Sequence, residues 1–315
     1  MSETYEHPAD VMAWAVNVLR EGQRCALAVV TDTEGGAVRA PGALMAVSSS
    51  GDAAGYVSGG CIDADVIQQA HLALQSGSPK KVRYGTGSPF VDIQLPCGGA
   101  IDVLLIADPD CATLETAVAA LERRASTALT FNADGSLNIA SPDAPTGWHG
   151  EAFTARYRPK LRLRIAGRGA DVVALASVAA ASGISCVVES PDDDCLSAAE
   201  RGGITETVKL ETPAAISANR DDAATAFALM FHDPHWEERL LRDALAGDAF
   251  YIGAVGSRRT QERRRDALAA AGLPQTDIDR IRGPIGLVPS MRDASMLAVS
   301  ALAEIVEAFH AETTR

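Results

Sequence analysis

Hydrophobic and polar residues follow two different patterns along the chain, and the change between them falls near residue 158. In the first part, short apolar runs are separated by Gly, Pro, Ser and Asp, which is typical of short strands in an α+β domain with a mainly antiparallel sheet. The runs interpreted as β-rich are residues 25–32, 42–49, 55–60, 80–85, 90–95 and 100–107. Helices are predicted over residues 9–21, 63–75 and 112–124.

Residues 125–158 form the last part of this region. The sequence STALTFNADGSLNIAS (126–141) contains an Asp-Gly step, which is a strong hairpin signal, and the apolar run GEAFTARYRP (150–159) follows it. This stretch is either the end of the first domain or a linking hairpin. We therefore place the first domain at residues 1–158, with 125–158 as its hairpin or linker.

After Pro159 the chain alternates strand and helix, and the strands are nearly continuous apolar runs. Residues 159–315 are accordingly predicted to form a Rossmann-like domain with a doubly wound parallel sheet, in which ligands bind at the carboxyl ends of the strands. The predicted strands are residues 160–167, 184–190, 204–210, 226–233 and 249–256. The predicted helices are residues 170–183, 198–203, 237–247, 257–272 and 292–311.

Bulk composition narrows the class of function. A formal net charge of −13 argues against nucleic-acid binding, which normally needs a basic surface. The N-terminus is acidic and carries no secretory pattern, and the longest apolar run, near residues 172–184, is too short to span a bilayer. We therefore expect a cytoplasmic protein with no membrane partner. The six cysteines include no C-x-x-C pair, which argues against a structural zinc site.

Two of the cysteines are flanked by glycines and are candidates for chemistry. Cys61 follows Ser58, Gly59 and Gly60 at a predicted helix start, where unpaired N–H groups favour the thiolate. Cys97 stands before Gly98 and Gly99 in LPCGG, where the chain is expected to turn. A thiolate is a nucleophile or a soft metal ligand. Taken alone, each cysteine is better explained as a small structural residue, as Cys25 and Cys186 are.

The second part offers a phosphate-type turn. Gly167 and Gly169 supply G-x-G between a strand and a helix, but Val172 stands where the fingerprint has its third glycine. Glu189, at the end of the next strand, is placed to accept a hydrogen bond from a ribose hydroxyl. The turn either binds a dinucleotide-like group or is a tight turn that belongs to the fold.

Two further loops follow the later strands. His232 and Asp233 come directly after an apolar strand, where they either face the crevice or begin a helix with Asp233 as its cap. In YIGAVGSRRT (251–260), Gly256 and Ser257 precede a helix, and Arg258 and Arg259 lie in its first turn. Cations there oppose the helix dipole unless an anion is bound, so this loop is a predicted anion site. The loop GPIGL (283–287) is placed to close on it.

Taken together and in this order, the motifs resemble one known family. APGALMAV, GYVSGGCIDADV, LPCGG, LRLRIAGRGADVV, FHDP, YIGAVGSRRT and GPIGL are similar to the xanthine dehydrogenase accessory factor family, also called XdhC/CoxI. The resemblance covers nearly the whole chain. It implies a molybdenum-cofactor chaperone that protects the cofactor during sulfuration and passes it to an apoenzyme of the xanthine oxidase class.

The resemblance also implies cofactors, partners and residue roles. The cofactor is the molybdopterin form, with or without an added nucleotide, and the partners are an apo molybdenum hydroxylase and a cysteine desulfurase. The protein itself is then no enzyme, and a homodimer is expected from the frequency of homo-oligomers. Cys61 and Cys97 become possible molybdenum contacts, and the arginines and backbone N–H groups hold the pterin phosphate.

Some residues depart from the family pattern. Ala170 stands where relatives commonly carry histidine, Val172 replaces a small residue, and no arginine follows Glu189 in ESPDDD. One alternative is an NAD(P)-dependent oxidoreductase that uses the Gly167 turn and Glu189, with His232 as proton donor. A third hypothesis is a scaffold that only recruits the desulfurase.

Overall fold

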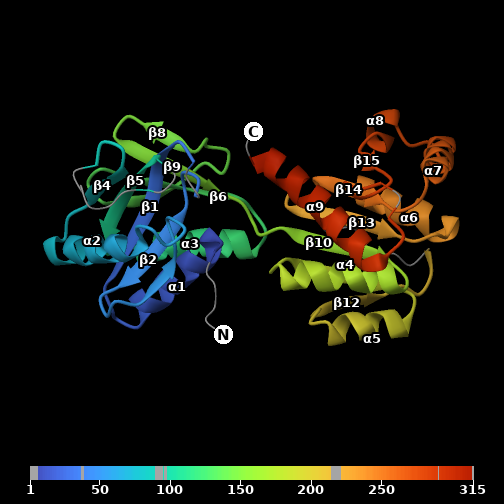
Figure 1. Cartoon of the computed structure of the whole chain (residues 1–315), viewed down its shortest axis with the longest axis horizontal. Coiled ribbons are helices and arrows are strands. Elements are labelled where there is room, and N and C mark those ends of the chain that lie inside the picture. The colour runs from blue at the N-terminus through green and yellow to red at the C-terminus, as the bar shows by residue number, and fades with distance from the viewer. Residues whose placement is uncertain are drawn as a thin grey trace. The chain divides into compact units, whose positions relative to one another are not determined.

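A computed structural model describes residues 6–36, 39–88, 95, 98–213, 221–289 and 291–313. The chain divides into two compact units, of which the first ends at Pro159 and the second begins at Lys160 (Figure 1). The first unit combines helices with antiparallel sheets and the second contains a parallel sheet, which confirms the expected fold class.

The first unit is built around a five-stranded sheet in the order β3-β2-β1-β5-β4, with every neighbouring pair antiparallel. Its central strand, β1, is buried on both faces. Leu27 and Val29 pack in a core with α1 and α3, whereas Ala28 and Val30 pack in a second core beneath α2. Side chains alternate across a strand, so a strand covered on both sides reads as a continuous apolar run.

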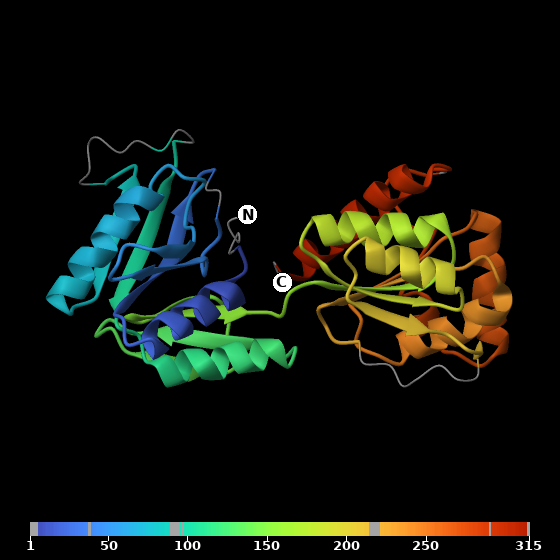
Figure 2. The same ribbon diagram turned by 90° about the horizontal axis from the view of Figure 1, so that it is seen from below.

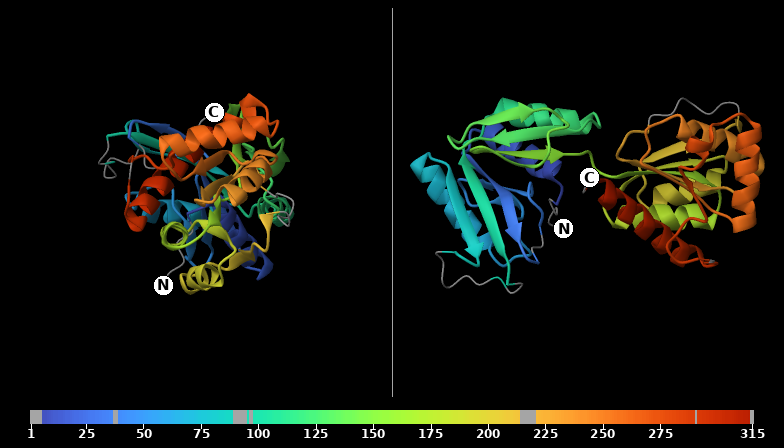
Figure 3. Two further views of the ribbon diagram at one scale, coloured as in Figure 1. Left: turned by 90° about the vertical axis from the view of Figure 1, so that its right-hand side faces the viewer. Right: turned by 90° about the horizontal axis from the view of Figure 1, so that it is seen from above.

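A second antiparallel sheet, β7-β6-β9-β8, contains residues of the expected hairpin or linker. Asp134 and Gly135 form the β6–β7 turn, and Gly135 has a positive φ of 87°. Phe131 and Phe153 pack in the same core as α1 and α3, so this stretch belongs to the first unit (Figure 3, right).

One expectation was wrong: residues 56–60 form no strand, because β3 ends at Gly55 and a turn follows. The run 90–95 lies almost wholly outside the described residues.

The elements of the first unit are, in chain order, α1 (Pro8–Arg20), β1 (Cys25–Glu34), β2 (Leu44–Ser48), β3 (Ala53–Gly55), α2 (Asp63–Ser76), β4 (Lys80–Gly85), β5 (Ala100–Ala107), α3 (Cys111–Glu122), β6 (Thr127–Phe131), β7 (Leu137–Ala140), β8 (Gly147–His149) and β9 (Ala152–Tyr157).

The second unit has a six-stranded parallel sheet in the order β12-β11-β10-β13-β14-β15. Numbered within the unit this is 3-2-1-4-5-6, the order of the dinucleotide-binding fold. Helices α4, α5 and α9 pack on one face, and α6, α7 and α8 on the other (Figure 2). The order reverses between β10 and β13, so the carboxyl ends of these two strands mark where such folds bind ligands.

The elements of the second unit are β10 (Arg162–Gly167), α4 (Ala170–Ala181), β11 (Ser185–Ser190), α5 (Asp193–Arg201), β12 (Glu206–Lys209), β13 (Thr225–Met230), α6 (Pro234–Leu245), β14 (Tyr251–Ala254), α7 (Arg258–Ala270), α8 (Gln275–Ile278), β15 (Ile281–Arg282) and α9 (Ala294–Thr313).

Helix α9 is unusually apolar for a helix at a protein surface. Among the described residues it is the one helix that is long and apolar enough, by length and composition, to cross a membrane. Core helices of soluble proteins satisfy the same criterion, and α9 packs one side against α4. Only 33% of the apolar segment is buried, however, so much of it is left uncovered.

Candidate functional site

The turn that carries Cys61 is held together by one carboxylate. We call residues 57–62 the cysteine turn. The side chain of Asp63 accepts hydrogen bonds from the backbone N–H groups of Val57 (3.2 Å), Ser58 (3.0 Å) and Gly60 (3.1 Å). It also accepts one from the Ser58 hydroxyl (3.0 Å). A carboxylate that accepts several donors at once fixes the conformation of the loop around it.

Ser58 and Gly60 complete the cysteine turn. The buried Ser58 hydroxyl oxygen accepts from the N–H of Gly60 (3.1 Å) and of Ile62 (3.3 Å). Gly60 has a φ of 102°, which L side chains rarely adopt, and its surroundings are open. Ile62 is buried against the sheet, whereas the adjacent Cys61 is exposed. The turn therefore anchors both sides of a cysteine whose sulfur faces solvent.

The cysteine turn and the glycines of LPCGG lie at the same end of the five-stranded sheet. Asp65, in the first turn of α2, accepts a hydrogen bond from the hydroxyl of Tyr84 (2.6 Å). Tyr84 is paired with Ile101, two residues after Gly99. The N–H of Thr86 in turn donates to the Gly99 carbonyl (3.2 Å). Cys97 lies outside the described residues, so its relation to Cys61 stays a prediction.

Gly99 also has a structural reason to be glycine. A Cβ built on it would overlap the carbonyl oxygen of Glu34, so the backbone at the start of β5 approaches the end of β1 closely. The same applies to Gly85, where a Cβ would overlap the Gly99 carbonyl oxygen. Gly98 has a positive φ of 68° with open space beside it. Of the two glycines that follow Cys97, Gly98 is the one with room for a ligand.

A cation lies beside the cysteine turn. The Arg39 guanidinium stands 4.4 Å from the centre of the Tyr56 ring and donates to the carbonyl oxygen of Glu6 (2.9 Å). Tyr56 directly precedes the turn in sequence. No local pattern in the sequence sets Arg39 against this region, and the stacking on Tyr56 places it there. An arginine near an exposed thiol can bind an anionic group of the same ligand.

The other described cysteines are poorly placed for chemistry. Cys25 and Cys186 are buried, and loss of hydration raises the pKa of each thiol to about 12. Cys195 is also buried. Cys111 is half-buried, and its pKa is raised by desolvation and by the Glu115 carboxylate, which lies 3.5 Å from its sulfur. Among the cysteines that the structure describes, Cys61 is the exposed one.

In the second unit, the G-x-G turn joins β10 to α4. A Cβ on Gly167 would lie 2.7 Å from the Met230 carbonyl oxygen, so this glycine permits the close approach of β10 to β13. Gly169 has a φ of 75° and open space beside it at the start of α4. Val172 is fully buried in the core between α4 and the sheet. The turn keeps an open helix N-terminus despite the missing third glycine.

Glu189 has a partner inside the protein. Arg164 forms ion pairs with Glu189 (3.2 Å), Asp221 (2.6 Å) and Asp243 (3.2 Å), and its guanidinium stacks 4.2 Å from the centre of the Phe227 ring. We call the four charged residues the Arg164 cluster. Desolvation raises the pKa of both Glu189 and Asp243, although the arginine opposes this effect. The Glu189 carboxylate is thus engaged in a buried ion cluster rather than presented to a ribose.

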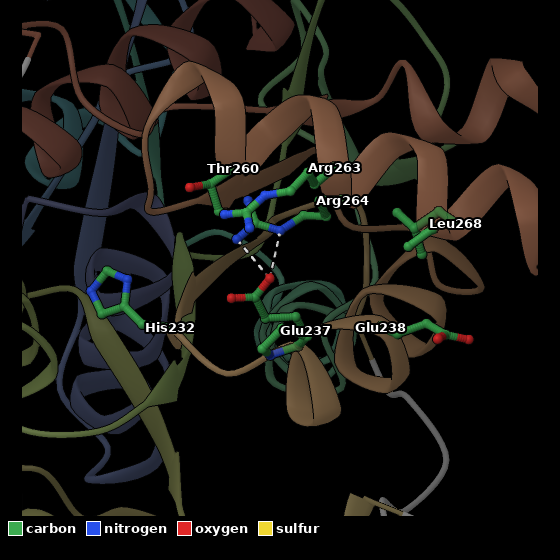
Figure 4. A pocket seen from close by; sticks show the side chains of 9 residues that line it. His232, Glu237, Glu238, Thr260, Arg263, Arg264 and Leu268 are labelled. Carbon is green, nitrogen blue, oxygen red and sulfur yellow. Dashed lines mark hydrogen bonds and ion pairs between the residues drawn. The ribbon is translucent and has the colours of Figure 1, made fainter.

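A cavity of about 290 Å³ opens between α6 and α7. On one wall, Arg264 donates to the Glu237 carboxylate (3.0 Å) and to the Gln261 side-chain oxygen (2.6 Å), and both charged residues are buried. Figure 4 shows Thr260 and Arg263 on α7 beside this pair, with His232 to one side. The lining combines this ion pair with further polar side chains and with the apolar Ala267 and Leu268.

The loops that begin α6 and α7 flank this cavity. Ser257 is the cap of α7, because its hydroxyl oxygen accepts from the Thr260 N–H (3.2 Å), and Gly256 has a φ of 124°. Arg258 and Arg259 are exposed in the first turn, which holds no acidic residue. Asp233 caps α6 by accepting from the N–H of His235 (3.0 Å). The alternative role of Asp233 as a cap is therefore the one observed.

The GPIGL loop contacts α7, as the sequence suggests. A Cβ on Gly283 would overlap the Gln261 side chain, so the loop backbone packs directly on this helix. The N–H of Ile285 donates to the Ala254 carbonyl oxygen (3.0 Å) at the end of β14. The loop is fixed to the same strand end from which the α7 loop starts.

With this geometry in hand, comparison with known proteins assigns the family. Residues 18–85, which include the cysteine turn, match the model of the XdhC and CoxI family. Residues 163–305 match the model of the XdhC Rossmann domain. The chain is also 35% identical, over 94% of its length and 86% of the relative's, to an Escherichia coli (strain K12) protein named molybdenum cofactor insertion chaperone PaoD. The chain belongs to the XdhC/CoxI family.

More distant relatives agree with this family. A Bacillus subtilis (strain 168) protein, named as a probable xanthine dehydrogenase component, is 24% identical over 92% of this chain and 94% of its own. A crystal structure from Bacillus halodurans, described as a xanthine dehydrogenase, superposes with a TM-score of 0.73 at 23% identity, covering 95% of this chain and 96% of that one. At this identity the structural likeness shows the shared fold alone.

Sequence reasoning missed several residues of the site. Asp63 was not among the predicted site residues, and its position two residues after Cys61 is the available signal for its role. Thr260 and Arg263, one and two helical turns into α7, become visible only through the cavity that they line. The partner of Glu189 depends on the pairing of β10 with β11, which no local pattern reveals.

Proposed function

We propose that this chain binds the molybdenum cofactor, protects it during sulfuration and passes it to an apo molybdenum hydroxylase of the xanthine oxidase class. The observation that carries the proposal is the cysteine turn: an exposed Cys61 held by Asp63, in a chain 35% identical to a protein named molybdenum cofactor insertion chaperone. The protein is then an accessory factor and not itself an enzyme.

The donor set around Cys61 suits a metal that arrives with its own ligands. Within the described residues no group of three or more His, Cys, Asp and Glu side chains is placed to hold a metal ion. A single thiol holds a free ion weakly, but it can complete the coordination of molybdenum already chelated by a pterin dithiolene, since soft sulfur prefers soft partners. We propose Cys61 as that contact, with Cys97 as a second one and Gly59, Gly60 and Ser58 shaping the approach.

Anionic groups of the cofactor need cations and N–H donors. At the start of the cysteine turn, the structure offers the cation of Arg39, which stacks on Tyr56. In the second unit we propose a further anion site at Gly256, Ser257, Arg258 and Arg259, with His232 at the cavity wall. The open N-terminus of α4 at Gly167 and Gly169 is a second position of the same kind. These sites suit the phosphate of the molybdopterin form and equally the added phosphate of a dinucleotide form.

Two macromolecular partners follow from this role. A cysteine desulfurase supplies the sulfur that replaces a terminal oxo ligand of the cofactor, and an apo hydroxylase receives the product. We propose that the chain works in the cytoplasm and, from the frequency of homo-oligomers among soluble proteins, as a homodimer. Protection requires that the chain hold the cofactor until the acceptor is present.

Measuring the cofactor that the purified chain retains tests the proposal. The protein is purified from cells with and without molybdopterin synthesis, and bound pterin is measured by fluorescence after oxidation alongside molybdenum by mass spectrometry. Near-stoichiometric pterin and molybdenum, present only in the first preparation, are expected. A chain that retains neither and still promotes activation of the hydroxylase would instead support a scaffold that only recruits the desulfurase.

An NAD(P)-dependent oxidoreductase is the second candidate, favoured by the strand order of the second unit. The Arg164 cluster weighs against it, because the Glu189 carboxylate is engaged by Arg164. Calorimetric titration with NADH and NADPH separates the two functions. Heat of binding with a micromolar dissociation constant would favour the oxidoreductase.

A further inference from the structure

The outer face of α9 carries an apolar stripe that nothing in the described part of the second unit covers. Met296 (56% exposed), Val299 (53%) and Val306 (47%) lie on this face together with the exposed Ala303. We call these four residues the α9 stripe. They follow the spacing i, i+3, i+7, i+10, which places them on one side of a helix. The opposite side packs on α4 through Ala298, Ala301, Leu302, Ile305 and Ala308 (Figure 1).

The apolar surface extends onto the neighbouring loop. Leu287 and Val288 are each 52% exposed. The N–H of Val288 donates to the Ser300 hydroxyl oxygen (2.8 Å), and the N–H of Leu287 donates to the Ser300 carbonyl oxygen (3.3 Å). These bonds hold the two side chains beside the α9 stripe. A preformed apolar surface of this kind marks an interaction site.

We propose that this surface binds a second copy of the same chain, with the two α9 helices antiparallel across a two-fold axis. The positions of the α9 stripe are symmetric about residue 301. A second copy in this orientation therefore sets Met296 opposite Val306 and Val299 opposite Ala303, and the small Ala303 lets the helices approach closely. An isologous contact of this kind closes on itself and gives a dimer.

The charges at the ends of the stripe fit this orientation. Arg292 stands just before α9 and Glu307 near its far end, and both are exposed. In the antiparallel pair, Glu307 of the second copy lies opposite Ser295, three residues from Arg292, whose long side chain can reach it. Each dimer contains this contact twice, and the two helix dipoles oppose each other favourably.

The same residues argue against a lipid surface as the occupant. Interfacial helices carry Lys and Arg on their polar face, which attract anionic lipids. Residues 294–313 contain no Lys or Arg and carry Glu304, Glu307 and Glu312, in a chain with a net charge of −13. A helix of 20 residues is about 30 Å long, and contacts of this size lie at the small end of stable interfaces. We therefore expect a dissociation constant on the order of micromolar.

Sedimentation equilibrium between about 1 and 100 μM tests the dimer around the expected micromolar constant. The wild-type chain is expected to dimerise with rising concentration, and Val299→Glu to remain a monomer. Leu72→Glu is the matched control, because Leu72 is 48% exposed on α2 of the first unit and should leave the dimer intact. Circular dichroism of each variant reports folding. A wild-type chain that stays monomeric, or equal effects of the two substitutions, would overturn the proposal.

A charge exchange tests the orientation. Arg292→Glu is expected to weaken dimerisation about tenfold, since it places like charges together at two contacts. Combining it with Glu307→Arg should restore the wild-type constant, because opposite charges then meet again. A double variant no tighter than the single one would exclude the antiparallel pair. Co-sedimentation of the wild type, but not of Val299→Glu, with phosphatidylglycerol vesicles would assign the surface to lipid instead.

Discussion

Replacing Cys61 with alanine is expected to lower the molybdenum retained by the purified chain by about 10- to 100-fold or more, which is the effect of disturbing even the surroundings of a metal ligand. The reason is that Cys61 is the exposed thiol among the described cysteines and sits in a turn fixed by Asp63. Molybdenum per chain, measured by mass spectrometry after gel filtration, reports the loss. Cys111→Ala is the control, because this half-buried thiol on α3 already contacts Glu115.

Asp63→Asn separates the sulfur itself from its positioning. Asparagine keeps the size of the side chain, but its amide group cannot accept from the N–H of Gly60 and its single oxygen must serve the remaining donors. Molybdenum retention should fall between the values for wild type and Cys61→Ala, while the number of thiols that react with a maleimide is unchanged. Full retention in Cys61→Ala would exclude a contact between its sulfur and molybdenum and would shift the proposal to Cys97.

Replacing Arg164 with methionine is expected to reduce the free energy of unfolding of the second unit by about 3–5 kcal/mol, because it leaves the buried carboxylates of the cluster without their cation. Urea titration followed by the fluorescence of Trp236, which stacks on Phe231 with ring centres 5.5 Å apart, reports this unit once Trp14 and Trp148 of the first unit are replaced by phenylalanine. Arg83→Met is the control. Arg83 bridges Glu34 and Asp102 in the first unit with a more exposed side chain, so its loss should lower the free energy of unfolding much less than the loss of Arg164.

The effect of Arg164→Met should also depend on pH. Desolvation raises the pKa of Glu189 and Asp243 in the folded protein, so the stability they contribute is full below the ordinary carboxyl pKa and is lost as pH rises through the raised values. Removing the guanidinium takes away the charge that opposes this shift. The variant should therefore approach wild-type stability in acid and differ most at neutral pH. A destabilisation that is the same at all pH values would show that the carboxylates are not its cause.

The fold of the second unit was predictable because buried parallel strands appear in the sequence as nearly continuous apolar runs. Strands such as β13 are almost wholly apolar, and a short loop with glycine or polar residues leads from each of β10, β11, β13 and β14 to a helix. The pairing of strands in the two sheets of the first unit was not visible in the sequence in this way. Whether β6 joins β5 or pairs with β9 depends on contacts between residues far apart in sequence, and the hairpin at Asp134 and Gly135 fits either arrangement.

The candidate site was also only partly predictable from the sequence. Glycines before Cys61 and a helix after it made this cysteine a candidate for chemistry, but they did not decide between an exposed thiol and a small structural residue. The four bonds to Asp63 were not predictable, since they require the loop to fold back over its own helix. The role of Glu189 was hidden for a related reason. A carboxylate at the end of a strand fits a ribose or a neighbouring arginine equally, and only the register of Ala166 against Glu189 places Arg164 beside it.

Transfer of the cofactor tests the proposed role most directly. The chain is loaded with sulfurated molybdenum cofactor, freed of unbound material and mixed with apo hydroxylase, and the two proteins are separated at intervals for molybdenum analysis. We predict that molybdenum leaves this chain and enters the hydroxylase in equal amounts, with hydroxylase activity rising in parallel. A chain that holds no cofactor after gel filtration, while the hydroxylase is activated just as fast by free cofactor alone, would contradict a chaperone function.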